Sequence, residues 1–196
     1  MILLAITPGL GFEPLRWRAV LHAGVDGFLI REPGLSTRRL LESARWCQDA
    51  APGLALWVAG RLDVALAAGC GVHAPEAYPD LAPGLGPLSR PLHEEAQWPG
   101  RRRADQLLVS PVFASPGKGA PWELSRFHAF LDTLPQDGPC LLALGGVTPG
   151  NAAALAHPRL GGIAAIRPFW DRDPRRVVQA FREAQEPRRS SGMPGV

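Results

Sequence analysis

The stretch Cys140-Leu-Leu-Ala-Leu-Gly145-Gly146-Val-Thr148-Pro149-Gly-Asn151 joins a buried strand to the start of a helix. Its continuous apolar beginning is typical of a strand that is covered on both faces. Thr148 suits the N-cap of a helix and Pro149 suits its first position. The two glycines between them leave backbone N–H groups open to an anion, often a phosphate. A tight turn without a ligand explains an isolated Gly-Gly equally well.

The composition is that of an ordinary globular domain. The chain has 196 residues, of which 46% are hydrophobic and 20% charged, enough for one well-buried domain. We expect a single domain over residues 1–186 and a loose tail over residues 187–196. The apolar segment 1–6 is too short to span a bilayer and lacks the basic start of a secretory signal, so we expect no membrane contact. Three scattered cysteines indicate reduced thiols in a cytoplasmic protein.

The basic charge does not indicate a nucleic-acid partner. The net charge is +3, but the run Arg101–Arg103 has no interleaved aromatic residues and belongs to no recognisable nucleic-acid module. Lys118, in a glycine-rich loop, is the one lysine among 21 basic residues. This usage reflects either chance or an ammonium group aimed at an anionic ligand. No zinc-ligand spacing is present, and we expect no metal site.

Strand and helix patterns alternate eight times along the chain. This alternation indicates either a (β/α)8 barrel or a doubly wound parallel sheet. The even count and the uniform repeat favour a compact (β/α)8 TIM barrel, although such barrels usually have about 250 residues. The strands are expected at residues 2–7, 28–32, 54–58, 72–74, 86–91, 105–113, 140–144 and 163–167.

A barrel places its chemistry at the carboxyl ends of its strands, and its phosphate site beside strands seven and eight. The Gly145-Gly146 turn follows strand seven, and Ile166-Arg167 ends strand eight. We therefore expect these four residues to bind a phosphate, mainly through backbone N–H groups. The arginine side chain either adds charge to that site or points away into a surface ion pair.

Seven motifs in this order resemble the thiamine phosphate synthase/TenI family, over about residues 2–170. They are Ile30-Arg31-Glu32, Gly60-Arg61-Leu62-Asp63, Gly71-Val72-His73, Ser110-Pro111-Val112-Phe113, Lys118, Ala143-Leu-Gly145-Gly146-Val-Thr148-Pro149 and Gly162-Ile163-Ala164. The resemblance implies a small phosphorylated ligand as the partner. Homo-oligomerisation is left open.

The resemblance implies two different activities within the family. The synthase joins a pyrimidine diphosphate to a thiazole phosphate and uses Mg²⁺ to neutralise the leaving diphosphate. Members with that activity have Gln and Lys beside the Arg-Glu pair, and Asn-Asp after strand three. Here Leu29 and Pro33 flank the pair, Ala59-Gly60 follows strand three, and Tyr78 stands at the second magnesium carboxylate. These departures disfavour the synthase.

A synthase with relocated metal ligands stays open, since Glu76 and Asp63 are spare carboxylates. Mg²⁺ is expected only in that case. The TenI branch, which shares the Gly-Arg-x-Asp motif, is the leading interpretation. TenI-like tautomerases aromatise a thiazole carboxylate phosphate without a metal. Their usual base is a histidine where this chain has Ser110, and a serine needs an activating neighbour. A third hypothesis is therefore a non-catalytic phosphate-ligand-binding or regulatory protein.

The remaining site residues follow from the resemblance and from their places at the strand ends. Arg31 is expected to hold a carboxylate in bidentate fashion, Lys118 to cover the ligand, and Ser89 to donate a hydrogen bond. Glu32 is the best remaining general base and His73 the next. The structural alternatives are a Glu32–Arg31 ion pair and a hydrogen-bonded His73 in the barrel rim. The other four histidines are predicted on helices away from this face: His22, His93, His128 and His157.

Overall fold

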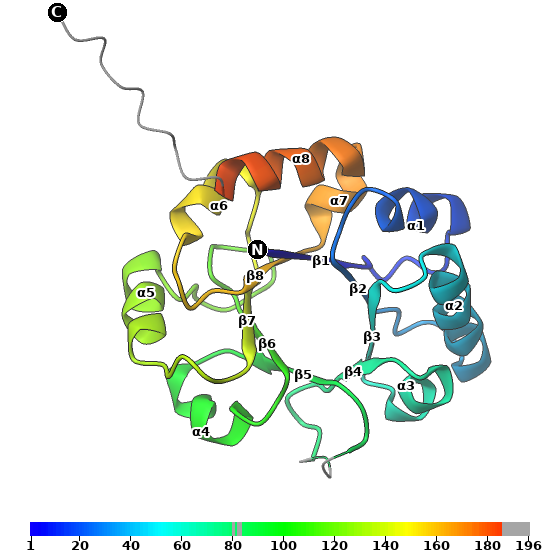
Figure 1. Ribbon diagram of the computed structural model, residues 1–196, viewed down its shortest axis with the longest axis horizontal. Coiled ribbons are helices and arrows are strands. Elements are labelled where there is room, and N and C mark those ends of the chain that lie inside the picture. Colours follow the sequence, from blue (N-terminus) through cyan, green and yellow to red (C-terminus); the bar gives the residue numbers. More distant parts are fainter. Residues whose placement is uncertain (80, 82–83, 186–196) are drawn as a thin grey trace, which may run out of the picture.

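Eight parallel strands close into a barrel in the computed structural model, which describes residues 1–79, 81 and 84–185 (Figure 1). The strands pair in chain order, and β8 pairs with β1 to close the ring. This confirms the compact (β/α)8 TIM barrel. The strands are β1 Ile2–Ile6, β2 Gly27–Ile30, β3 Ala55–Ala59, β4 Gly71–His73, β5 Leu88–Leu92, β6 Gln106–Val109, β7 Cys140–Ala143 and β8 Gly162–Ala165.

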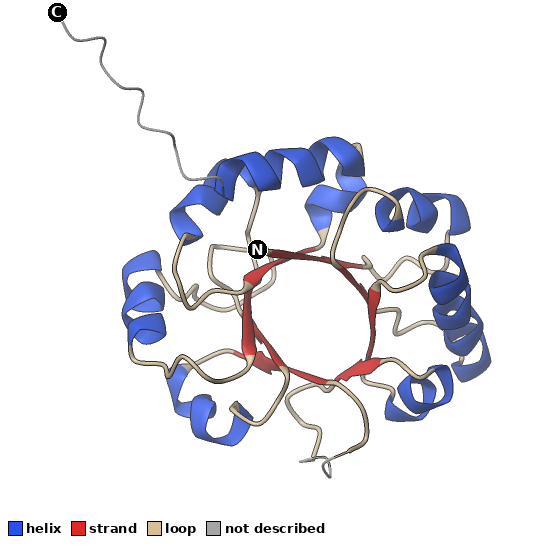
Figure 2. Cartoon of the chain, in the orientation of Figure 1, coloured by secondary structure: helices blue, strands red, loops and turns tan. Residues whose placement is uncertain are grey.

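The helices form an outer ring around the strands, as Figure 2 shows. None of the described helices is long and apolar enough to cross a bilayer. The tail predicted for residues 187–196 lies outside the described residues, and the single-domain boundary stays a prediction. The helices are α1 Pro14–Leu21, α2 Thr37–Ala50, α3 Leu62–Ala68, α4 Trp98–Arg101, α5 Leu124–Asp132, α6 Pro149–Ala152, α7 Arg167–Asp171 and α8 Pro174–Gln185, with 3₁₀ turns at Glu95–Gln97 and Ala153–Leu155.

Several strands end earlier than the sequence predicts, and two of these differences, in β6 and β8, shape the site. β6 stops at Val109 instead of Phe113. The residues that follow turn towards the loop after β7, where the Phe113 N–H donates to the oxygen of Gly145 at 3.0 Å. β8 stops at Ala165, and Arg167 begins the short helix α7, which was not expected from the sequence. A proline follows Arg167 and suits the first turn of a helix.

The inside of the barrel is apolar on one side and polar on the other. Trp57 of β3 fills the apolar side, and it needs the glycine at position 71 because a Cβ there would lie 2.3 Å from its ring. On β4, β5 and β6 the inward positions at one level are His73, Ser89 and Gln106, which are paired in register. The apolar cluster comprises Leu4, Ile6, Leu29, Trp57, Leu108, Leu142 and Ala164.

Candidate functional site

The loop after β7 has its carbonyl groups tied to the protein and its amide groups free. The oxygen of Gly145 accepts from Phe113 N–H at 3.0 Å, and that of Gly146 accepts from the Asn151 amide Nδ2 at 2.9 Å. Within the described part of the chain, no acceptor meets the backbone N–H groups of Gly145, Gly146 and Val147. The loop therefore presents three consecutive backbone donors, the arrangement that binds an oxyanion. We call residues 145–147 the amide cradle.

The two glycines are required by the backbone and by a neighbouring loop. Gly145 and Gly146 have φ angles of 93° and 65°, which favour glycine. A Cβ on Gly145 would lie 2.7 Å from Cα of Pro111, and one on Gly146 would lie 2.5 Å from the oxygen of Ala114. The absence of a side chain at both positions thus lets the loop after β6 pack closely against them. From the sequence alone, we expected the ligand to occupy that space.

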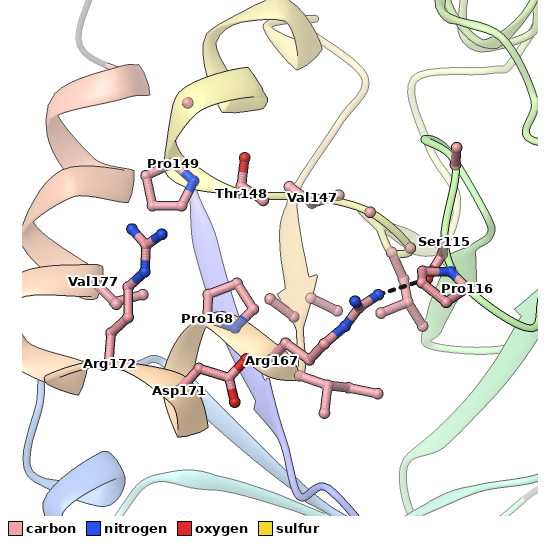
Figure 3. A pocket seen from close by; sticks show the side chains of 18 residues that line it. Ser115, Pro116, Val147, Thr148, Pro149, Arg167, Pro168, Asp171, Arg172 and Val177 are labelled. Atoms are coloured by element: carbon pink, nitrogen blue, oxygen red, sulfur yellow. Dashed lines mark hydrogen bonds between the residues drawn. The ribbon is translucent and has the colours of Figure 1, made fainter.

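A cavity of about 560 Å³ opens over the amide cradle (Figure 3). Its walls come from the loops that follow β6, β7 and β8, so the barrel brings together three distant segments. All four residues predicted for the phosphate line it: Gly145, Gly146, Ile166 and Arg167. The expected neighbourhood of strands seven and eight is therefore present, and a cavity of this size can hold a small ligand.

Arg167 lies along this cavity and does not form a surface ion pair. Its Nη2 donates to Oγ of Ser115 at 3.2 Å, across from the loop after β6 (Figure 3). No carboxylate of the described residues comes within ion-pair distance of it. Because Arg167 is the first residue of α7, its side chain leaves from a helix start instead of a strand end.

Lys118 belongs to the same β6–α5 loop but does not line the cavity. Its side chain is exposed, and its backbone N–H donates to the oxygen of Ser115 at 3.1 Å. The role of Lys118 as a cover over the ligand stays a prediction.

His73, Ser89 and Gln106 form a hydrogen-bonded row inside the barrel. Nδ1 of His73 lies 2.8 Å from Oγ of Ser89, and Nε2 of Gln106 donates to that same Oγ at 3.2 Å. Ser89 is fully buried, and its hydroxyl makes its hydrogen bonds to the two other residues of this row. Burial, together with the smaller effects of Arg31, Arg90 and His93, lowers the pKa of His73 to about 4. His73 is thus neutral at pH 7 and its ring is held in place.

Glu32 binds the backbone of the loop after β1. Its Oε1 and Oε2 accept the N–H groups of Gly9 and Gly11 at 3.0 and 2.7 Å, and the side chain is only 5% exposed. Both carboxylate oxygens are thereby occupied, and no ion pair joins Glu32 to Arg31 among the described contacts. Arg31 is exposed, and its charge acts on His73, so it lies at the mouth of the barrel.

His93 is a candidate site residue that sequence reasoning missed. It was predicted to start a helix away from the site, but it follows β5 directly and faces the end of β6. Its Nδ1 lies 2.8 Å from the backbone oxygen of Ser110 and 3.4 Å from Oγ of that residue. The sequence feature that could have identified His93 is its position directly after the last residue of a strand. The helical pattern of residues 93–98 obscured that feature.

The tautomer of His93 follows from this contact. A carbonyl oxygen can only accept, so Nδ1 carries a hydrogen, and in the neutral tautomer the lone pair is then on Nε2. An Nδ1–H group cannot take the proton of the Ser110 hydroxyl, and His93 therefore does not activate that serine. Nε2 faces the Glu76 carboxylate at 4.0 Å, and the Glu76 side chain is also bound by the Gln97 amide.

Comparison with known proteins agrees with the barrel. The family model described as thiamine monophosphate synthase matches residues 14–169. The chain belongs to this family. It is 30% identical over 164 residues to a thiamine-phosphate synthase of Albidiferax ferrireducens, covering 76% of this chain and 73% of the relative. It is 33% identical over 168 residues to that of Chloroflexus aurantiacus, covering 76% of each.

The fold is shared more widely than the family. A thiamine phosphate pyrophosphorylase of Pyrococcus furiosus superimposes with a TM-score of 0.78 at 21% identity, covering 94% of this chain and 95% of that one. The N-(5'-phosphoribosyl)anthranilate isomerase of the same organism gives a TM-score of 0.65 at 13% identity, with coverage of 94% and 98%. At these identities the likeness concerns the fold alone.

Among the residues that the structure describes, the carboxylates do not gather into a magnesium site. Asp63 is held by the guanidinium of Arg61, with its two oxygens 3.0 and 2.6 Å from Nε and Nη2. Glu76 contacts Gln97 and Arg101, and Glu32 binds backbone N–H groups. Over the described residues, no three side chains of the types His, Cys, Asp and Glu gather as metal ligands. Asp63 and Glu76 thus each have a side-chain partner, and their role as relocated metal ligands stays a prediction.

Proposed function

We propose that the protein binds a thiazole phosphate and aromatises the carboxylate form of that ligand as a tautomerase. The observation that carries the proposal is the amide cradle: three consecutive unpaired N–H groups, beside Arg167, at the wall of a cavity of about 560 Å³. Backbone donors and a guanidinium suit a phosphate because both supply hydrogen bonds in a fixed geometry.

The rest of the ligand extends from the cradle to the mouth of the barrel. Arg31 is exposed there, and its guanidinium suits the carboxylate of the ligand. The neutral ring of His73 belongs to β4, and the pair His93–Ser110 follows the ends of β5 and β6, the strands that lead round the ring to β7. The thiazole ring then lies between an anion-binding side and an imidazole side.

His93 is the acid and base of the proposed reaction. Its Nε2 takes a proton from the non-aromatic ring, and the Glu76 carboxylate at 4.0 Å stabilises the imidazolium that forms. The imidazolium then returns a proton to the ring at another atom, so no group is gained or lost. An imidazole suits both steps because it can take up and release a proton near neutral pH.

The test is to incubate the protein with the thiazole tautomer carboxylate phosphate and to follow the absorbance of the aromatic product. Acceleration over buffer supports the proposal. Binding of the ligand by calorimetry without acceleration would reject the tautomerase and leave a phosphate-ligand-binding protein. Absence of binding would reject both.

The synthase is the second candidate, because the two relatives at 30% and 33% identity are thiamine-phosphate synthases. It would couple a pyrimidine diphosphate to the thiazole phosphate and release pyrophosphate. This candidate requires Mg²⁺. The described carboxylates already have protein partners, and this disfavours a magnesium site. Mg²⁺-dependent release of pyrophosphate from the two substrates would establish it, and no release at high protein concentration would exclude it.

A further inference from the structure

The row His73–Ser89–Gln106 fixes which ring nitrogen of His73 carries the hydrogen. Nε2 of Gln106 donates to Oγ of Ser89 at 3.2 Å, so this oxygen already accepts one hydrogen bond. The Ser89 hydroxyl is fully buried and has to donate its own hydrogen. Within the described part of the chain, the acceptor in its reach is Nδ1 of His73 at 2.8 Å. Nδ1 therefore holds the lone pair, and the hydrogen of the neutral ring lies on Nε2.

Nε2 of His73 is a hydrogen-bond donor without a protein partner. This atom is on the other edge of the ring from Ser89, is reached by solvent, and has no acceptor among residues 1–79, 81 and 84–185. Burial is the main reason that the pKa of His73 is about 4, so the ring stays neutral at pH 7. The lone pair that could take up a proton is on Nδ1 and is used by Ser89. His73 can thus donate to a ligand but cannot accept a proton from it through Nε2.

The side chains of Arg31 and His73 face the same space at the mouth of the barrel. Ala59 of β3 pairs in register with His73, and Arg31 continues the pairing of β2 with β3 to that level. Leu29, two residues before Arg31, belongs to the inner apolar cluster, so the alternation of a strand gives Arg31 the inner face as well. Only the methyl group of Ala59 stands between the two side chains. A guanidinium and an N–H group on one inner face suit an anionic oxygen such as that of a carboxylate.

We propose that His73 binds the carboxylate of the ligand together with Arg31, as a neutral donor through Nε2–H, and takes no proton in the reaction. The two imidazoles at the mouth then have separate roles: His73 donates a fixed hydrogen bond, and His93 moves the proton. The inference rests on the proposed function for the identity of the ligand. The tautomer of His73, by contrast, is a property of the free protein and can be tested without any ligand.

The first test reads the tautomers in the free full chain at pH 7 by ¹⁵N NMR of the histidine rings, with His73→Gln to identify the signals of His73. We expect the hydrogen of His73 on Nε2. His93 is the internal contrast, since its contact with the backbone oxygen of Ser110 places a hydrogen on Nδ1. A hydrogen on Nδ1 of His73 would overturn the inference, whatever ligand the protein binds.

The second test measures by calorimetry the affinities for the aromatic thiazole carboxylate phosphate and for thiazole phosphate, which lacks the carboxylate. His73→Ala should weaken binding of the carboxylate ligand about tenfold and that of thiazole phosphate less than about twofold. His73→Gln should recover part of the loss, because its amide can donate. His128→Ala is the matched control, since His128 lies on α5 in the outer ring of helices, and it should change neither affinity.

The outcomes separate the inference from the proposed function. Equal losses for the two ligands in His73→Ala would overturn the inference, since a merely structural role weakens both. If both ligands bind to the wild type and His73→Ala changes neither affinity, the inference is wrong while the proposed binding stands. If the wild type binds neither ligand, the proposed function is wrong and the carboxylate role of His73 falls with it, whereas a hydrogen on Nε2 still establishes His73 as a neutral donor.

Discussion

Nδ1 of His93 lies 2.8 Å from the backbone oxygen of Ser110 and 3.4 Å from its hydroxyl oxygen. The contact joins the ends of β5 and β6 and places an imidazole beside the position where TenI-like tautomerases are expected to have their histidine. Because the backbone oxygen makes the shorter contact, the ring is oriented by the main chain and hardly by the serine side chain. The roles of the two residues can therefore be separated by experiment.

Replacing His93 by glutamine should lower kcat of the proposed tautomerase about 10²- to 10³-fold, since general acid–base catalysis contributes factors of this order. KM for the thiazole ligand should change less than about threefold, because the amide cradle does not involve His93. Steady-state kinetics over a range of pH measures both. His22→Gln is the control, since His22 ends α1 and contacts the oxygen of Ala50 at the end of α2, in the outer ring of helices. An unchanged kcat in His93→Gln would remove His93 from the mechanism.

Ser110→Ala should lower kcat by about tenfold at most. The substitution deletes the hydroxyl at 3.4 Å but keeps the carbonyl oxygen that orients His93 at 2.8 Å. A lost neutral hydrogen bond costs about 1 kcal/mol. The same kinetic assay applies. A loss as large as that of His93→Gln would show instead that the serine itself transfers the proton.

Glu32→Gln should lower the free energy of unfolding by about 1–3 kcal/mol, because a charged acceptor of two backbone N–H groups is replaced by an amide with one acceptor oxygen. The pH profile of kcat should keep its shape. Urea denaturation and pH–rate profiles measure the two effects. Glu42→Gln is the control, since Glu42 is exposed on α2. If Glu32→Gln left stability intact and lowered kcat a hundredfold, the predicted base role of Glu32 would be correct.

His73 should make the protein less stable as the pH falls from about 6.5 to about 4. Its pKa is about 4 in the folded state, against an ordinary value of 6.5 in the unfolded chain. Between these values the unfolded chain binds a proton that the folded chain does not, so protonation favours unfolding. The full loss amounts to about 3 kcal/mol. Urea denaturation at several pH values measures it for the wild type and for His73→Asn. Equal slopes in the two proteins over this range would contradict the prediction.

Gly146→Ala should destabilise the protein by about 1–3 kcal/mol and weaken phosphate binding. The added Cβ would lie 2.5 Å from the oxygen of Ala114, and the φ of 65° strains an alanine. Thermal unfolding and calorimetry with inorganic phosphate measure the effects. Gly119→Ala is the matched control, because nothing lies within 4 Å of its Cβ position and its φ is not positive. Unchanged stability and affinity in Gly146→Ala would show that the two loops can separate without cost.

The sequence by itself determined the barrel and the cavity wall at the ends of β7 and β8. Each strand is a short apolar run, and each turn and helix start has local signals such as Gly146 or Thr148, so neighbouring residues carry the information. The positions of Gly145, Gly146 and Ile166 in one cavity wall then follow from the ring of strands, because the ends of β7 and β8 are adjacent.

Only the tertiary structure decided what the side chains at the mouth of the barrel do. Glu32 binds Gly9 and Gly11, and His93 binds Ser110, across separations of 17 to 23 residues. Such contacts depend on where each strand ends, and a difference of one residue turns a side chain to the other face. Hydrophobic patterns locate those ends only roughly. The same limit of sequence reasoning applies to Arg167. Its side chain leaves from the start of α7 and so points in a direction that the end of a strand would not give it.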